Sequence, residues 1–236
     1  MTGSRTDDDA RLLRRFAPHD VVSTLAFVIG FRDVAYRRRA VDLLRLAKGD
    51  RVVEIGCGTG RNFPLLEHAV GPSGAVVAVD LSEAMLARAR KRAAGHGWSN
   101  VELVHSDAAT YEFPAPVDGV LSTYTLVALP EYDRVIEKAC GALKDGKRCV
   151  VLDQKLPSGP ASRLVPLLDV LSRPLDYSGT LRDRRVWESI RRHAGNVHVE
   201  ERYFGFVYLA VGEKNTPGAQ PRTNPWKPEH RNPRLR

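Results

Sequence analysis

An acidic residue followed by three alternating glycines is the stretch of this sequence with the clearest chemical meaning. The apolar run at residues 52–55 contains Glu54 and leads directly into Gly56-Cys57-Gly58-Thr59-Gly60. Such a run is typical of a buried strand that breaks into a tight turn and opens a helix, here expected at Arg61. Because glycine has no side chain, the backbone of this turn can approach a ligand closely. The stretch therefore predicts a binding loop.

The spacing of the glycines narrows the choice of ligand. A dinucleotide-binding G-x-G-x-x-G pattern would need its third glycine at Arg61, but here it falls one position early, at Gly60. No Gly-Lys-Ser/Thr sequence follows, which excludes a nucleoside-triphosphate loop. The turn therefore need not be a phosphate cradle.

Two further apolar runs also end at acidic residues. The run at residues 74–80 ends in Asp80, about 24 residues beyond Gly56, where nucleoside-binding folds place a carboxylate on the ribose hydroxyls. A third expected strand, residues 101–105, is followed by Ser106-Asp107-Ala108. Three strand-end acids in this order favour a nucleoside-containing ligand.

These motifs resemble those of the class I S-adenosylmethionine-dependent methyltransferases. Their first motif, E-x-G-x-G-x-G, is complete here as Glu54, Gly56, Gly58 and Gly60. The resemblance implies a Rossmann-like fold and S-adenosylmethionine as the cofactor, whose charged methionine end replaces a pyrophosphate. It covers approximately residues 30–213.

The same resemblance implies a role for several individual residues. Asp80 would bind the ribose, Leu81 and Met85 would lie near the adenine, and Asp107 would accept a hydrogen bond from the adenine amino group. The complete set of expected cofactor-binding residues is Glu54, Gly56, Cys57, Gly58, Gly60, Asp80, Leu81, Met85, Asp107 and Ala108. For Asp107 taken alone, helix capping remains an equal alternative.

The resemblance also implies that the loop after the expected fourth strand lies beside the reactive methyl group. It reads Ser122-Thr123-Tyr124-Thr125-Leu126-Val127 and lacks both the Asn/Asp-Pro-Pro-Tyr/Phe and the Pro-Cys signatures of nucleobase methylation. Tyr124 is the catalytic candidate: its phenol either orients the nucleophile or only forms a wall of the pocket. Methyl transfer from an activated sulfonium depends mainly on in-line positioning. An amine acceptor would also have to lose a proton, for which Asp153, His105 and Tyr124 are candidates.

Alternating strand and helix patterns predict an α/β fold: a Rossmann-like, doubly wound, seven-stranded sheet, mostly parallel, with one antiparallel strand at a C-terminal hairpin. The expected strands are residues 52–55, 74–80, 101–105, 118–122, 148–152, 197–203 and 206–212. The expected helices are residues 61–70, 82–94, 130–143 and 184–193. The segment at residues 157–183 is also apolar and would suit a hydrophobic substrate.

Charge divides the chain of 236 residues into three parts. Residues 1–50 carry a net charge of +3, residues 214–236 carry +5, and residues 51–213 are neutral. We therefore expect an N-terminal helical cap at 1–50, a cofactor-binding domain at 51–213 and a basic, proline-rich disordered tail at 214–236. Basic flanks can meet phosphates of lipid or of nucleic acid.

The N-terminal flank combines apolar and cationic residues between positions 11 and 39. Its apolar run at 21–31 is too short to cross a bilayer, which takes about 20 residues. It ends near Tyr36-Arg37-Arg38-Arg39, so it either docks on anionic headgroups or packs over the active site as a lid. The polar start of the chain and its three unpaired cysteines favour a cytoplasmic protein. If the flank docks on anionic headgroups, we expect this protein to contact the inner face of the membrane peripherally.

The sequence thus predicts a methyltransferase acting on a small-molecule or lipid-like acceptor. It is similar to the bacterial phosphatidylethanolamine N-methyltransferases and the ubiquinone/menaquinone-biosynthesis methyltransferases, so a phospholipid amine is one expected acceptor. The alternatives are a soluble methyltransferase for quinone-type or other small molecules and, less favoured, a basic enzyme that modifies nucleic acid. No metal site is indicated, and the sequence does not specify an oligomeric state.

Overall fold

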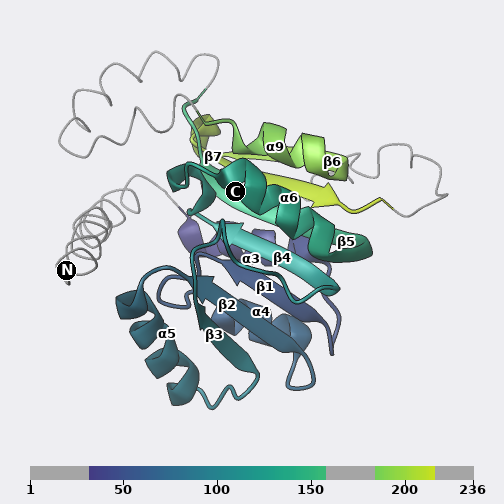
Figure 1. Cartoon of the computed structure of the whole chain (residues 1–236). Coiled ribbons are helices and arrows are strands. Elements are labelled where there is room, and N and C mark those ends of the chain that lie inside the picture. The colour runs from purple at the N-terminus through teal and green to yellow at the C-terminus, as the bar shows by residue number, and fades with distance from the viewer. Residues whose placement is uncertain (1–31, 158–183, 216–236) are drawn as a thin grey trace, which may run out of the picture.

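Seven strands form one sheet in the computed structural model, which describes residues 32–157 and 184–215 (Figure 1). The strand order is β3-β2-β1-β4-β5-β7-β6, and β7 runs antiparallel to both of its neighbours. This arrangement confirms the predicted fold. The strands are β1 (Arg51–Ile55), β2 (Ala75–Asp80), β3 (Val101–His105), β4 (Val117–Thr123), β5 (Leu143–Gln154), β6 (Gly195–Arg202) and β7 (Val207–Glu213).

Helices cover both faces of this sheet because successive strand residues point to opposite sides. Val52 packs with α3 and α4, whereas its neighbour Val53 packs with α6 and α9. α5 lies on the same face as α3 and α4, against Ala78 of β2. The helices are α3 (Asp33–Leu44), α4 (Phe63–Val70), α5 (Glu83–Gly95), α6 (Tyr132–Ala142) and α9 (Val186–His193), with the short turns η1 (Leu126–Ala128) and η4 (Tyr203–Gly205).

Two predicted boundaries differ from the structure for an identifiable physical reason. α4 begins at Phe63 instead of Arg61, because the glycine turn continues through Asn62, whose side chain is buried. β5 begins at Leu143 instead of residue 148, because Leu143 already pairs with Val117 of β4. The residues between the expected helix at 130–143 and the expected strand at 148–152 therefore lie within the span of β5.

The carboxyl ends of β1 and β4 form the point where the strand order reverses. From β1 the chain proceeds outward through β2 and β3, and then returns to the other side of β1 with β4. Ligands of open α/β sheets bind in the crevice at such a point. The first residues of α3 reach the same edge, since Arg37 contacts Thr123 at the end of β4.

Several expectations fall outside the described residues. These are most of the cap (residues 1–31), nearly all of the apolar segment (158–183) and nearly all of the basic tail (216–236). Within the described ranges, no helix has the length and apolar character needed to cross a membrane.

A buried ion pair ties the amino end of the sheet together. Arg148 of β5 donates to the Glu213 carboxylate of β7 from Nε and Nη2, at 3.1 and 3.0 Å. Its Nη1 donates to the carbonyl oxygen of Leu43 in α3 at 3.2 Å. Because Arg148 is buried, its positive charge depends on these acceptors for stabilisation.

We expect Glu213→Gln to lower the free energy of unfolding by about 3 kcal/mol, because it leaves a buried guanidinium without a counter-charge. The matched control is Glu112→Gln, since Glu112 is highly exposed where it pairs with Lys138; here we expect a loss below about 1 kcal/mol. Urea denaturation followed by circular dichroism measures both. If both variants lost the same free energy of unfolding, burial of the Arg148–Glu213 ion pair would not explain its contribution to stability.

Candidate functional site

The glycine turn after β1 leaves one backbone position open. Gly56, Gly58 and Gly60 have φ of 69°, 54° and 74°, a left-handed region that side chains disfavour. A Cβ on Gly56 would lie 2.2 Å from the side chain of Thr125, and one on Gly60 would lie 2.5 Å from the ring of Phe63. Nothing lies within 4 Å of the corresponding position on Gly58. The outer glycines are therefore needed for packing, while Gly58 faces open space.

Asp80 lies beside this open position at the end of β2. Its Oδ2 accepts from the Gly58 N–H at 2.7 Å, and its Oδ1 accepts from the Ser82 N–H at 2.9 Å. Each carboxylate oxygen has a second lone pair, so both can still accept from a ligand. Burial raises the pKa of Asp80, and the backbone N–H groups of Ser82 and Gly58, together with smaller effects of His105 and the Leu81 backbone, counteract this.

The expected adenine side lies next to Asp80. Leu81 is 45% exposed and is therefore available to a ligand, whereas Met85 is half-buried on α5. In the turn that follows the neighbouring strand β3, Asp107 accepts from the Ala109 N–H through Oδ1 at 2.8 Å, and Ala108 is buried. Asp107 therefore stabilises its own turn and keeps its other oxygen for a second donor. Its role toward adenine stays a prediction.

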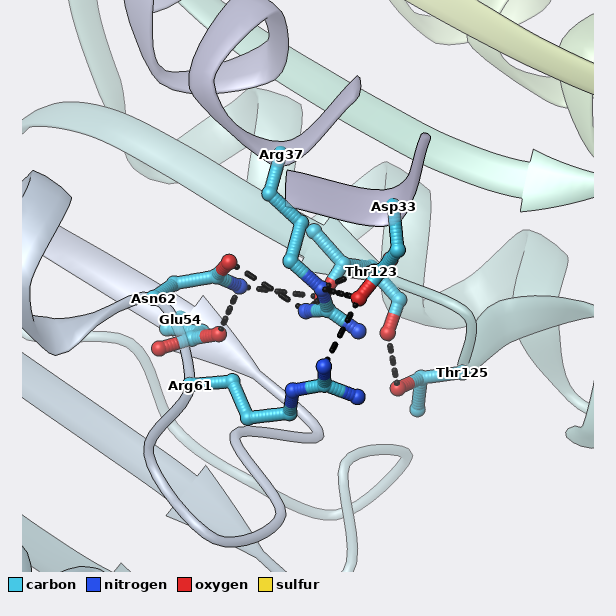
Figure 2. A network of polar contacts seen from close by, with 7 residues as sticks. All are labelled: Asp33, Arg37, Glu54, Arg61, Asn62, Thr123 and Thr125. Atoms are coloured by element: carbon cyan, nitrogen blue, oxygen red, sulfur yellow. Dashed lines mark hydrogen bonds and ion pairs between the residues drawn. The ribbon is translucent and has the colours of Figure 1, made fainter. Parts of the chain in front are cut away.

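Glu54, the acid of the first motif, is buried at the end of β1 with 1% exposure. Its Oε1 accepts from Asn62 Nδ2 at 2.6 Å, and the same amide nitrogen lies 3.0 Å from Thr123 Oγ1 (Figure 2). Oε2 has no hydrogen-bond partner among the described residues. Burial raises the pKa of Glu54 to about 7, although Asn62 and Arg37 lower it. One carboxylate oxygen of the buried Glu54 is therefore available to accept a hydrogen bond from a ligand.

α3 contributes charged residues to this network, which the sequence did not predict. Figure 2 shows Arg37 and Asp33 pointing from α3 toward Asn62 and Thr123. Arg37 Nη1 donates to Thr123 Oγ1 at 2.8 Å and to Asn62 Oδ1 at 3.2 Å, and its Nε donates to Asp33 at 2.9 Å. Asp33 also pairs with Arg61 at 3.1 Å. The available signal was the Asp33/Arg37 spacing of four within a helix, which usually marks only a surface pair.

Tyr124 follows β4 and lies between the two sides of the site. It has a φ of 56°, and the guanidinium of Arg37 lies 5.0 Å from the centroid of its ring. Burial, reinforced by the Asp33 carboxylate, raises the pKa of the phenol well above its usual range. Tyr124 therefore stays protonated at neutral pH and can act as a donor, but not as a base.

Thr125 brings two backbone carbonyl groups to one point. Its Oγ1 lies 3.3 Å from the carbonyl oxygen of Gly56 and 3.1 Å from that of Thr123. A hydroxyl has one proton, so it cannot satisfy both acceptors fully at the same time. A ligand with several donors would fit this position better.

Asp153 and His105, the other ionisable candidates, have different surroundings. Asp153 is fully buried, and its carboxylate accepts from the Val127 and Gln154 N–H groups, both at 2.9 Å. Burial raises its pKa to about 7. Arg184 donates to the Val127 carbonyl oxygen at 2.7 Å, so both the N–H and the carbonyl group of Val127 are hydrogen-bonded. His105 is exposed at the end of β3, with Nε2 2.8 Å from the Leu81 carbonyl oxygen.

The three cysteines are free and buried. Burial raises the pKa of the Cys57 thiol far above its ordinary value. Since the thiolate is the nucleophilic form, Cys57 packs within the turn and does not attack a substrate.

Comparisons with known proteins agree with this geometry. Residues 52–146 match the methyltransferase domain family. The chain is 29% identical to a demethylmenaquinone methyltransferase of Listeria monocytogenes over 168 residues, 70% of each protein. It is 34% identical over 131 residues to an aklanonic acid methyltransferase of a Streptomyces species, covering 55% of this chain and 59% of that one.

Solved structures show the same fold. The crystal structure of an S-adenosylmethionine-dependent O-methyltransferase from Thermotoga maritima aligns with a TM-score of 0.56 at 18% identity, over 78% of this chain and 66% of that one. The sheet and its glycine turn thus define a Rossmann-like methyltransferase domain. Residues 52–146 thus form a methyltransferase domain, and the chain is an S-adenosylmethionine-dependent methyltransferase that resembles the class I enzymes, including those of quinone biosynthesis.

Burying Glu54 should make the ligand-free protein less stable at higher pH. The folded pKa of about 7 exceeds the ordinary 4.5, so folding takes up a proton between these values and stability falls as the pH rises through them. We expect Glu54→Gln to raise the free energy of unfolding by up to about 3 kcal/mol at pH 8 and by almost nothing at pH 4. Denaturant titrations across this range measure the gain. A gain in the free energy of unfolding that does not change with pH would contradict this prediction.

Proposed function

We propose that the adenosine part of S-adenosylmethionine binds along the ends of β1, β2 and β3. The support is the fit of Asp80: each oxygen uses one lone pair on the backbone and keeps one for a ribose hydroxyl. Gly58 has open space beside it, and the exposed Leu81 offers an apolar surface to the adenine. Asp107 and Ala108 would close the far side of the adenine.

The methionine end would lie over Gly56, between β1 and β4. An ammonium group has three donors, and the carbonyl oxygens of Gly56 and Thr123 already converge on one donor position, now taken by the Thr125 hydroxyl. The nearby Glu54 carboxylate favours a cation, and its Oε2 lacks a partner among the described residues. Thr125 would turn aside when the ammonium binds.

This assignment predicts a selective effect of Asp80→Asn. The amide has one acceptor oxygen in place of two, so one ribose hydroxyl loses its partner. We expect the affinity for S-adenosylmethionine to fall at least about tenfold by calorimetry. Glu83→Gln is the matched control, since Glu83 lies three residues away on the exposed side of α5. Unchanged affinity in Asp80→Asn would remove the ribose assignment.

For the acceptor, we propose an apolar molecule of the quinone type. The observation that carries this proposal is the similarity to a demethylmenaquinone methyltransferase over 70% of the chain. The aklanonic acid methyltransferase supports it, because its name also gives a small organic molecule as the substrate. The expected acceptor side is also apolar, since Leu126 and Val127 are buried after β4 and Tyr36 and Tyr203 are partly buried.

The side chains on the acceptor side would mainly position the acceptor, and they would contribute little acid-base chemistry. Bound S-adenosylmethionine supplies an electrophilic methyl group, so the acceptor must offer an electron pair from a carbon or an oxygen. Tyr124, which stays protonated, can donate a hydrogen bond to an acceptor oxygen. Asp153 would hold the η1 turn in place through Val127, keeping this loop aligned with the methyl group.

A positioning role of Tyr124 predicts a change in turnover without a change in cofactor binding. With reduced demethylmenaquinone as the acceptor, we expect Tyr124→Phe to lower kcat about tenfold, the value of one lost hydrogen bond. The dissociation constant of S-adenosylmethionine should stay within about twofold. Tyr132→Phe, which changes a half-buried tyrosine on α6, is the control. Unchanged kcat would show that Tyr124 only forms a wall.

The phospholipid-amine alternative needs an extra step. A protonated amine has no electron pair to attack with, so it must lose its proton before methyl transfer. Incubating the enzyme with radiolabelled cofactor and either phosphatidylethanolamine vesicles or reduced demethylmenaquinone separates the two acceptors. Label in the phospholipid alone would overturn the quinone-type proposal but not the cofactor site.

A further inference from the structure

We propose that the turn between β6 and β7, together with the first two turns of α3, docks on an anionic lipid surface. This surface, here called the aromatic edge, comprises Arg32, Val34, Arg38 and residues 203–206. The inference rests on the proposed apolar acceptor, because an enzyme docked in this way would receive its substrate directly from the lipid. It keeps the end of the N-terminal flank singled out in the sequence and adds residues 203–206, which lie far from that flank along the chain.

Phe204 is exposed and held in an unfavourable backbone conformation. Its side chain is 77% exposed, the largest value among the large apolar side chains that the structure describes. Tyr203, Phe204 and Gly205 have consecutive positive φ values of 49°, 56° and 87°. A bulky residue rarely adopts this conformation, and an exposed phenyl ring adds no burial energy in return. Such a combination is expected where the ring contacts another surface.

Neighbouring aromatic rings enlarge this apolar tip. The ring centroid of Tyr203 lies 5.7 Å from that of Phe204 and 6.2 Å from that of Phe206. Tyr203 itself is partly buried against the core cluster that also contacts Tyr36 of α3. The turn is therefore anchored by Tyr203 and presents Phe204 outward. An aromatic pair of this kind, one ring anchored and one free, suits the boundary between water and lipid.

The aromatic edge lies on the same side of the sheet as the cofactor site. Val207, the first residue of β7, pairs with Gln154, the last residue of β5, so the turn before it lies at the carboxyl ends of the parallel strands. The first turn of α3 lies there too, because Asp33 and Arg37 join the Thr123 network (Figure 2). Val34 on that turn is 64% exposed. A surface bound at this edge would lie beside the site.

The charges around the turn favour an anionic surface. Its acids are already paired: Glu200 with Arg39 and Arg202, and Glu201 with Lys155. Across residues 32–157 and 184–215, by contrast, the exposed Arg32 and Arg38 form no ion pair with an acidic side chain. Exposed apolar rings beside such cations match the headgroup region of an anionic bilayer.

Vesicle co-sedimentation of the full chain tests the proposal. With vesicles of phosphatidylglycerol and phosphatidylcholine, we expect binding that weakens as salt rises and is absent with phosphatidylcholine alone. Phe204→Ser should weaken binding about tenfold, since it removes one ring that would enter the lipid. Arg38→Glu should weaken it and reduce its salt dependence. Lys91→Glu, on the exposed face of α5, is the matched charge control and should bind like the unchanged chain.

Phe204→Trp provides a second readout, because tryptophan favours the membrane interface. We expect it to retain binding, and its fluorescence to shift to shorter wavelength on adding the anionic vesicles. Thermal denaturation of Phe204→Ser without lipid examines the competing occupant: a lower melting temperature with unchanged vesicle binding would mean that Phe204 packs on another part of this chain. That result, or equal binding by all variants, would overturn the proposal.

Calorimetry with S-adenosylmethionine on the same preparations separates this proposal from the preceding one. We expect the affinity to be unchanged in the Phe204, Arg38 and Lys91 variants, because these residues lie outside the assigned cofactor contacts. Normal cofactor binding without vesicle binding would overturn only the docking surface. Vesicle binding without cofactor binding would overturn only the assigned cofactor site.

Discussion

The burial of the Glu54 carboxylate is the constraint on which the rest of this site depends. A carboxylate taken out of water needs donors, or it takes up a proton. Here Asn62 donates directly to Glu54, and two other parts of the chain hold Asn62 in place: Thr123 accepts from the same amide nitrogen, and Arg37 of α3 donates to both Asn62 and Thr123. Solvating one acid thus fixes α3, the glycine turn and the end of β4 relative to each other.

Glu54 and Asp153 are both buried acids with pKa values raised to about 7, yet their surroundings differ in one decisive respect. Both oxygens of Asp153 accept from backbone N–H groups of its own protein, so this carboxylate holds a loop in place. Glu54 leaves one oxygen without a partner among the described residues. A similar pKa therefore accompanies the positioning role that we propose for Asp153 and the ligand-binding role that we propose for Glu54.

The carboxyl edge of the sheet combines several features that reduce stability. The glycine turn, Tyr124 and the turn at Phe204 all have positive φ values there, and Glu54 is buried with an incomplete set of donors. The amino edge also has positive φ values, at Arg45 and in the turns at Gly49 and Gly71, but there the buried Arg148 finds well-placed acceptors for its donors. Such a division is expected when one edge of a sheet holds the fold together and the other is shaped for a ligand.

The sequence by itself determined the class of enzyme, the sheet and the cofactor. Strand-end acids and alternating glycines are local patterns. Their spacing in the sequence predicts their positions in the structure, because each pattern belongs to one strand and the turn after it. Only the tertiary structure decided that Arg37 and Asp33 join the site, that Asn62 bonds Glu54, and that Phe204 lies at the same edge. These contacts join residues far apart in the chain, and their geometry depends on how α3 and β7 pack on the sheet, which no local pattern records.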